Sequence, residues 1–177
     1  MVRTIDILNA RILIVDDQSS HVLLLERMLR DAGYTSVEST MESTEVCTLH
    51  RNNRYAAILL DLRMPGMDGF QVMEALKEVD QDEELPVLVI TAEPGHKLRA
   101  LRAGARDFVS KPLDMPEVLI RVHNMIEIRL LRLESELLHV QLVDAQNAQK
   151  LASVEAQKLA GVYAQKLASV DGQKLAS

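Results

Sequence analysis

Short apolar segments that each end on a polar residue constrain the fold of this chain more than any other feature. They occupy residues 11–15, 57–60, 87–90 and 107–110. Short segments rich in Ile, Val and Leu are typical of parallel strands covered on both faces of a sheet. The polar residues at their ends are Asp16, Asp17, Asp61, Thr91 and Lys111. Since the carboxyl ends of parallel strands share one edge of a sheet, we expect these side chains to form one site.

Segments with apolar residues at helical spacing separate these runs. After the first run, Ser19 and Ser20 offer an N-cap, apolar residues recur up to Leu29, and Gly33 ends the helix. A weaker strand is expected at residues 36–39. Further helices are expected at residues 42–51, 72–79 and 98–105, and a last one begins near Met115. The alternation predicts an α/β fold, a doubly wound five-stranded parallel sheet with right-handed crossovers.

Composition and charge argue against several classes of protein. The formal net charge of −6 is unlike that of nucleic-acid-binding proteins, which carry a basic face. The single cysteine, Cys47, cannot form an internal disulfide, which fits a reducing cytoplasm. No stretch approaches the roughly 18 apolar residues of a membrane span, and Asp6 and Asn9 interrupt any signal-peptide core. We therefore expect a cytoplasmic protein that binds neither nucleic acid nor membrane.

The polar residues at the strand ends have the chemistry of a cation and phosphoryl site. Asp16, Asp17 and Asp61 would repel one another at close range unless a cation neutralised them. Mg²⁺ prefers oxygen ligands and binds through one or two carboxylates together with waters and phosphate oxygens. A carboxylate can also attack phosphorus and form an aspartyl-phosphate. A Lys ammonium and a Thr hydroxyl, the groups of Lys111 and Thr91, could then serve the remaining phosphoryl oxygens.

Taken together, these motifs make the chain resemble the receiver domain of two-component response regulators over about residues 9–130. The matching motifs, in the order and spacing of the family, are Ile-Leu-Ile-Val-Asp16-Asp17, Leu-Leu-Asp61-Leu-Arg-Met-Pro65-Gly66-Met-Asp68-Gly69, Ile-Thr91-Ala92 and Phe108-Val-Ser-Lys111-Pro112. Any one of them alone would be a weak signal. The resemblance implies a flavodoxin-like fold.

The resemblance also implies roles in binding the metal and accepting the phosphoryl group. Asp61 is expected to be the phosphoacceptor and a metal ligand, and Asp17 a direct ligand of Mg²⁺. Asp16 would hold the ion through water. The backbone carbonyl of Arg63, two residues after the acceptor, would complete the protein ligands.

The residues that would sense the phosphoryl group are implied in the same way. Thr91 and Lys111 are expected to bind its oxygens. Phe108 matches the switch aromatic of the family, which is often Tyr, and is expected to turn inward when Thr91 moves toward the phosphate. The Lys111–Pro112 peptide bond is cis in the family.

The last helix continues past the end of a minimal receiver. Its apolar residues recur at heptad spacing, and His123 takes the core position that the apolar residues skip. The apolar residues are Leu119, Ile126, Leu130, Leu133, Leu137 and Val140. Two interpretations remain open, a coiled-coil homodimer through residues 119–140 or an amphipathic helix packed on its own domain. The segment is similar to linkers that join receivers to phosphodiesterase, cyclase or kinase domains.

An eight-residue unit that begins Gln-Lys-Leu-Ala repeats from Gln149 onward. Its Leu and Val alternate at spacings of three and five, so on a helix their stripe drifts by about 80° per repeat. Gly161 and Gly172 weaken a helix further, and we expect a weakly stable, solvated helix or a disordered tail. The chain then divides into an N-terminal extension at 1–9, a receiver domain at 10–127, a helical linker at 128–148 and a low-complexity repeat tail at 149–177.

The resemblance implies a phosphoacceptor that takes its phosphoryl group, with Mg²⁺, from a sensor histidine kinase or a phosphotransfer protein. Transfer to Asp61 would switch a dimerisation or partner-binding surface. No enzymatic activity is expected beyond self-phosphorylation and autodephosphorylation. Two alternatives remain: the regulatory half of a cyclic-dinucleotide phosphodiesterase, cyclase or hybrid kinase without its output domain, and an interaction scaffold that never turns over phosphate.

Overall fold

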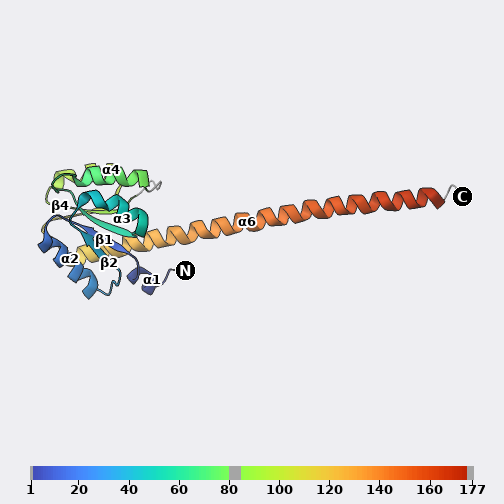
Figure 1. Ribbon diagram of the computed structural model, residues 1–177. Coiled ribbons are helices and arrows are strands. Elements are labelled where there is room, and N and C mark those ends of the chain that lie inside the picture. The colour runs from blue at the N-terminus through green and yellow to red at the C-terminus, as the bar shows by residue number, and fades with distance from the viewer. Residues whose placement is uncertain (1, 80–84, 175–177) are drawn as a thin grey trace. The chain divides into compact units, whose positions relative to one another are not determined.

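A five-stranded parallel sheet lies in the N-terminal part of the computed structural model, which describes residues 2–79 and 85–174 (Figure 1). The strands are β1 (Ile12–Val15), β2 (Val37–Thr40), β3 (Ala57–Asp61), β4 (Leu85–Thr91) and β5 (Ala105–Ser110). They lie in the order β2-β1-β3-β4-β5, and every neighbouring pair is parallel. The predicted doubly wound, flavodoxin-like fold is therefore confirmed.

The helices alternate with these strands along the chain. They are α1 (Thr4–Leu8), α2 (Ser19–Asp31), α3 (Val46–Asn53), α4 (Gly69–Val79), α5 (Lys97–Arg102) and α6 (Met115–Lys174), with short 3₁₀ turns η1 (Ser43–Glu45) and η2 (Pro94–His96). The chain forms two compact units, unit 1 at Met1–Leu133 and unit 2 at Glu134–Ser177, and each is described by itself. No described helix combines the length and the apolar character that a bilayer span needs.

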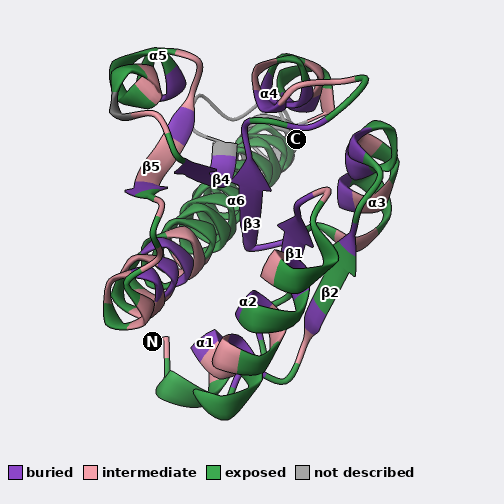
Figure 2. Ribbon diagram, turned by 90° about the vertical axis from the view of Figure 1, so that its left-hand side faces the viewer, coloured by how far each residue is buried: buried purple, intermediate pink, exposed green. Residues whose placement is uncertain are grey.

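Two hydrophobic cores cover the two faces of the sheet in unit 1. Successive strand residues point to opposite faces, so Ile12 and Ile14 enter one core whereas Leu13 and Val15 enter the other. The first core is completed by α1, α2 and the first part of α6, and the second by α3, α4 and α5 (Figure 2). The strands are thus buried on both faces, which explains why their sequences are almost continuously apolar.

The structure corrects the sequence analysis at two local boundaries. The N-cap of α2 is Gln18, whose side chain makes no capping hydrogen bond, and Ser19 and Ser20 are already the first residues of the helix. Ala105 begins β5 and does not belong to the preceding helix, which ends at Arg102. Helical spacing predicted the wrong element for Ala105 because a single buried Ala satisfies either pattern.

The N-terminal extension contributes a short helix that the sequence analysis did not predict. Arg3 and Asp6 close a capping box at the start of α1, in which the Arg3 N–H donates to Asp6 Oδ2 at 2.9 Å. Ile7 is buried in the first core. This extension therefore packs as part of unit 1.

The first residues of the predicted heptad pattern pack on the core of unit 1, whereas the later ones are exposed. Ile126 is completely buried in the first core, and Leu119 and Leu130 pack against that core. Packing on the chain's own domain therefore accounts for the first part of the pattern. Leu133 and Leu137 are exposed.

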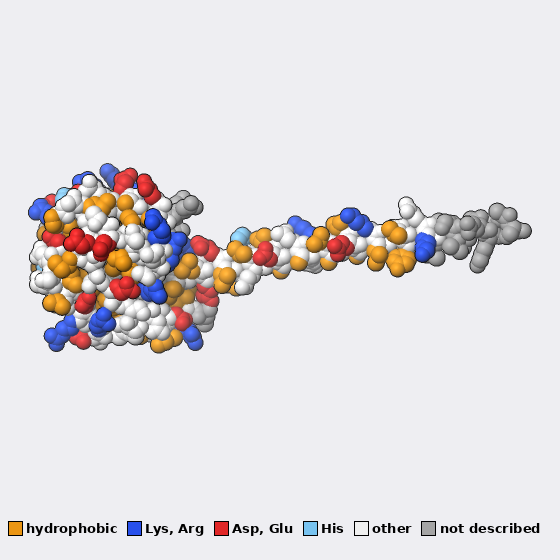
Figure 3. All heavy atoms as spheres, viewed as in Figure 1, with side chains coloured by type: hydrophobic (Ala, Val, Ile, Leu, Met, Phe, Trp, Pro, Cys, Tyr) orange, Lys and Arg blue, Asp and Glu red, His pale blue; other side chains and the backbone are white. Residues whose placement is uncertain are grey.

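Unit 2 consists of the remainder of α6, which is helical to Lys174. The repeat tail lies within this helix, except that its last residues, 175–177, fall outside the described residues. Every side chain that the structure describes from residue 135 to residue 166 is exposed, including many Leu and Val (Figure 3). Tertiary contacts within unit 1 therefore do not explain the helicity of this segment.

Candidate functional site

Three carboxylates come together where β1 and β3 end. Val15 pairs with Leu60 in the parallel ladder, so the next residues of both strands, Asp16 and Asp61, emerge side by side. One carboxylate oxygen each of Asp16, Asp17 and Asp61 lies within 4.8 Å of the others. Asp16 and Asp61 are buried. The predicted acidic cluster is therefore present.

The donor set of this cluster fits a magnesium ion. Asp17 Oδ1 is buried and has no hydrogen-bond partner among the described residues. A buried carboxylate oxygen without a partner is unfavourable, and a cation would compensate it. The atoms that these three carboxylates offer to a metal are all hard oxygens, the ligands that Mg²⁺ prefers. The residues present therefore fit the ion that the sequence analysis expects.

Lys111 joins the carboxylates from the end of β5. Its Nζ lies 2.9 Å from Asp61 Oδ1 and 3.3 Å from Asp16 Oδ2. The Lys111 N–H donates to the Thr91 carbonyl at 2.8 Å, which ties the loop to the end of β4, and the Lys111–Pro112 peptide bond is cis. The ammonium group is thus next to the carboxylate that was predicted to accept a phosphoryl group.

Thr91 and Phe108 lie on the two strands beyond β3. Thr91 is buried, and its Oγ1 accepts the backbone N–H of Glu93 at 3.0 Å. Phe108 is only partly buried, and Lys97 Nζ lies 4.0 Å from the centre of its ring, within the range of a cation–π interaction. The two residues predicted to form a switch therefore have separate partners in this structure.

The pKa of Asp61 is raised above its ordinary value, mainly because burial disfavours the charged carboxylate. The hydrogen bond and the positive charge of Lys111 oppose this effect, Asp16 adds repulsion, and the Arg63 N–H lowers the pKa slightly by donating to Asp61 Oδ2 at 3.2 Å. A cation in the cluster would favour the ionised form of Asp61, which is the nucleophilic one.

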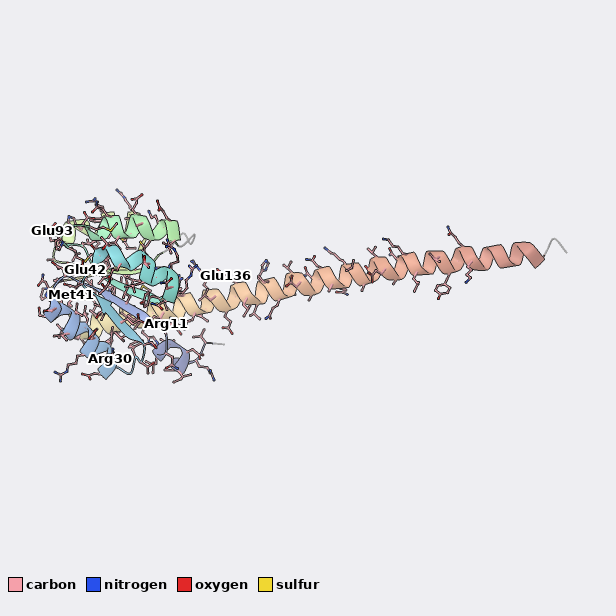
Figure 4. The ribbon with its side chains drawn as sticks, in the orientation of Figure 1. Arg11, Arg30, Met41, Glu42, Glu93 and Glu136 are labelled. Atoms are coloured by element: carbon pink, nitrogen blue, oxygen red, sulfur yellow. The ribbon has the colours of Figure 1, made fainter. Side chains whose placement is uncertain are left out.

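Residues that follow the strands lie at one end of unit 1. In Figure 4, Met41 and Glu42, which follow β2, and Glu93, which follows β4, lie at one end, whereas Arg11, which precedes β1, lies at the other. Glu93 pairs with the guanidinium of Arg63. The cluster thus occupies the edge at which ligands bind in open α/β sheets.

Two residues of the site were not assigned a role in the sequence analysis. The sequence patterns did not point to His21, yet its Nδ1 lies 3.0 Å from Asp16 Oδ2. Its place in the first turn of the helix after the paired aspartates was the available signal. Gly69 appeared only as the end of a matching motif, but a Cβ there would lie 2.7 Å from the Asp61 carbonyl oxygen. Only the folded backbone reveals this second constraint.

Comparison with known proteins identifies the fold and the family. Residues 12–123 match the family model of the response regulator receiver domain. The response regulator PleD of Caulobacter vibrioides is 38% identical over 125 residues, which are 70% of this chain and 27% of PleD. A putative response regulator from Chloroflexus aurantiacus superposes with a TM-score of 0.63 at 30% identity, over 67% of this chain and 98% of that structure.

A second solved structure bears on the metal. The receiver domain of the sensor histidine kinase PA1611 from Pseudomonas aeruginosa, which has a magnesium ion coordinated in its active-site cleft, superposes with a TM-score of 0.61. It is 27% identical and covers 67% of this chain and 98% of its own. The chain spans between 27% and 51% of the length of curated relatives such as PleD.

Proposed function

Because this chain belongs to the response regulator receiver domain family, we propose that Asp61 accepts a phosphoryl group from the phosphohistidine of a sensor kinase or a phosphotransfer protein. The observation that carries the proposal is the contact of 2.9 Å between Asp61 Oδ1 and Lys111 Nζ inside a cluster of three carboxylates. This proximity supports the proposal, because a nucleophile would then act next to an ammonium that could bind phosphoryl oxygens and next to carboxylates that could bind a metal ion.

The transfer is a substitution at phosphorus. An Asp61 oxygen forms a bond to phosphorus while the bond from phosphorus to the histidine nitrogen breaks, and the leaving imidazole retains the electron pair and takes up a proton. Lys111 remains close enough to neutralise a phosphoryl oxygen, and Thr91 supplies a hydroxyl for another. Asp17 and the Arg63 carbonyl would bind Mg²⁺ directly and Asp16 through water, and the bound ion would neutralise charge that builds up on the phosphoryl oxygens.

The switch would begin at Thr91. A phosphoryl oxygen on Asp61 would accept the Thr91 O–H and draw Thr91 toward the phosphate, away from the Glu93 N–H that donates to Thr91 Oγ1. Phe108 then fills the space beside Thr91 and leaves Lys97. Phosphorylation thereby biases the surface formed by α5 and β5.

Phosphate incorporation tests the proposal directly. The full chain is incubated with acetyl phosphate and MgCl₂ and its intact mass is measured. We expect a mass gain of one phosphoryl group that disappears in Asp61→Asn and when EDTA is added. The absence of a gain, or an equal gain in Asp61→Asn, would exclude Asp61 as the acceptor.

The output that we propose is a homodimer through the exposed part of the heptad pattern. Since Ile126 is buried in unit 1, the seam begins near Leu130 and includes Leu133, Leu137 and Val140. Exposed leucines at heptad spacing are typical of a helix that buries them against a second helix.

Paired substitutions test the dimer. Leu137 and Leu138 are both 59% exposed, but only Leu137 belongs to the heptad seam. We expect Leu137→Asp to shift the sedimentation equilibrium of the chain toward monomer and Leu138→Asp to leave it nearly unchanged. A wild-type chain that stays monomeric at all concentrations would refute the dimer without affecting phosphorylation.

A further inference from the structure

His21 lies near two groups of the site, and we propose that this residue competes with ligands for them. It is a positioning residue in the first turn of α2, and its Nδ1 lies 3.0 Å from Asp16 Oδ2 and 3.2 Å from Lys111 Nζ. The inference deepens the proposed function, on which it rests. Asp16 and Lys111 are the groups that a hydrated magnesium ion and a phosphoryl group would otherwise engage, and His21 can hold one of them at a time.

One nitrogen of His21 thus faces an anion and a cation. Nδ1 either donates a proton to Asp16 or accepts one from Lys111, because a single ring nitrogen cannot do both at once. When Nδ1 donates to Asp16, it engages a lone pair of the carboxylate. When Nδ1 accepts from Lys111, it engages one N–H of the ammonium group. Whichever tautomer is present, one group of the site is already engaged.

Burial makes His21 the replaceable member of this network. The side chain of Asp16 is 1% exposed and that of Lys111 is 18% exposed, whereas 29% of the His21 side chain is exposed. Asp16 is fixed further by the Gln18 N–H, which donates to Oδ1 at 2.9 Å. The imidazole can therefore turn away from the site without disturbing a buried core.

Ligand binding would then have to displace whichever contact His21 makes. A water of the metal shell would take the place of the imidazole at Asp16 Oδ2, or a phosphoryl oxygen would take its place at Lys111. The lost contact offsets part of the binding free energy. Removing the side chain should consequently tighten binding, whereas a residue that merely supported the fold would weaken it when removed.

Calorimetric titration of the full chain with MgCl₂, at constant pH and ionic strength, tests the inference. We expect His21→Ala to bind Mg²⁺ about two- to tenfold more tightly than wild type, the range that one net hydrogen bond covers. His21→Asn places an amide atom at the position of Nδ1 and should retain an affinity near that of wild type. Leu24→Ala, an exposed change on the same helix, controls for a general effect on α2.

Each outcome decides the matter. Tighter binding by His21→Ala, but not by His21→Asn or Leu24→Ala, supports the inference. Equal or weaker binding by His21→Ala, or an equal gain in all variants, overturns it while the proposed function stands. If neither wild type nor any variant binds Mg²⁺, the metal site itself is refuted and the inference is refuted with it.

Discussion

The two units share one helix, α6, but bury its side chains very differently. In unit 1, Val118, Val122 and Ile126 are fully buried beneath the sheet. In unit 2, every side chain described from residue 135 to residue 166 is exposed. The first segment is stabilised mainly by tertiary packing, whereas the second relies on helix propensity and, in the dimer that we propose, on a second helix. Similar spacing of apolar residues is therefore buried in one part of the helix and exposed in the other.

The largest expected effect comes from truncating the buried side of α6. Ile126→Ala should lower the free energy of unfolding by about 2–5 kcal/mol, because it leaves a cavity in the first core. Leu138→Ala, at an exposed position of unit 2, should change it by less than about 0.5 kcal/mol. Urea denaturation of both variants at low protein concentration measures the difference. Equal losses would contradict the distinction between the two segments.

Replacing a glycine by alanine should change stability in opposite directions in the two units. At Gly69 the new Cβ would meet the Asp61 carbonyl oxygen at 2.7 Å and Leu62 Cα at 2.9 Å, both backbone atoms, so we expect a loss of about 1–3 kcal/mol. At Gly161, within α6, nothing lies within 4 Å of a Cβ.

Gly161→Ala should therefore stabilise the helix by about 0.5–1 kcal/mol. Circular dichroism at 222 nm would record a gain in helicity for Gly161→Ala, and thermal melting a loss of stability for Gly69→Ala. If both substitutions stabilised the chain, the backbone around Asp61 would be less constrained than we describe.

The smallest expected effect is a pH dependence of the free energy of unfolding, and it arises in unit 1 alone. The folded pKa of Asp61 is raised, so between the ordinary pKa of Asp and this raised value the native state binds more protons than the unfolded state. The free energy of unfolding should accordingly fall as pH rises through this window in EDTA. Asp61→Asn should lack this decline, which urea titrations at several pH values would reveal. An unchanged decline in the variant would assign it to another group.

Much of unit 1 was predictable because its patterns are local. Continuous apolar runs and helical spacing determine where strands and helices form, and the order of these elements leads to the doubly wound sheet. The side chains placed at one edge were those that end or directly follow a strand, namely Asp16, Asp17, Asp61, Thr91 and Lys111. The packing of α1 through Ile7 was not predictable, since a short amphipathic segment does not encode its docking position.

For this protein, residue order alone decided where the strands and the helices between them form and which polar groups lie at the strand ends, because both depend on neighbours in the sequence. The tertiary structure decided which of those groups touch. It placed His21 between Asp16 and Lys111, residues 95 positions apart in the chain, and it buried Ile126 while leaving Leu137 exposed. The physical reason is that a heptad pattern specifies an apolar face, whereas only the packed domain specifies what covers that face.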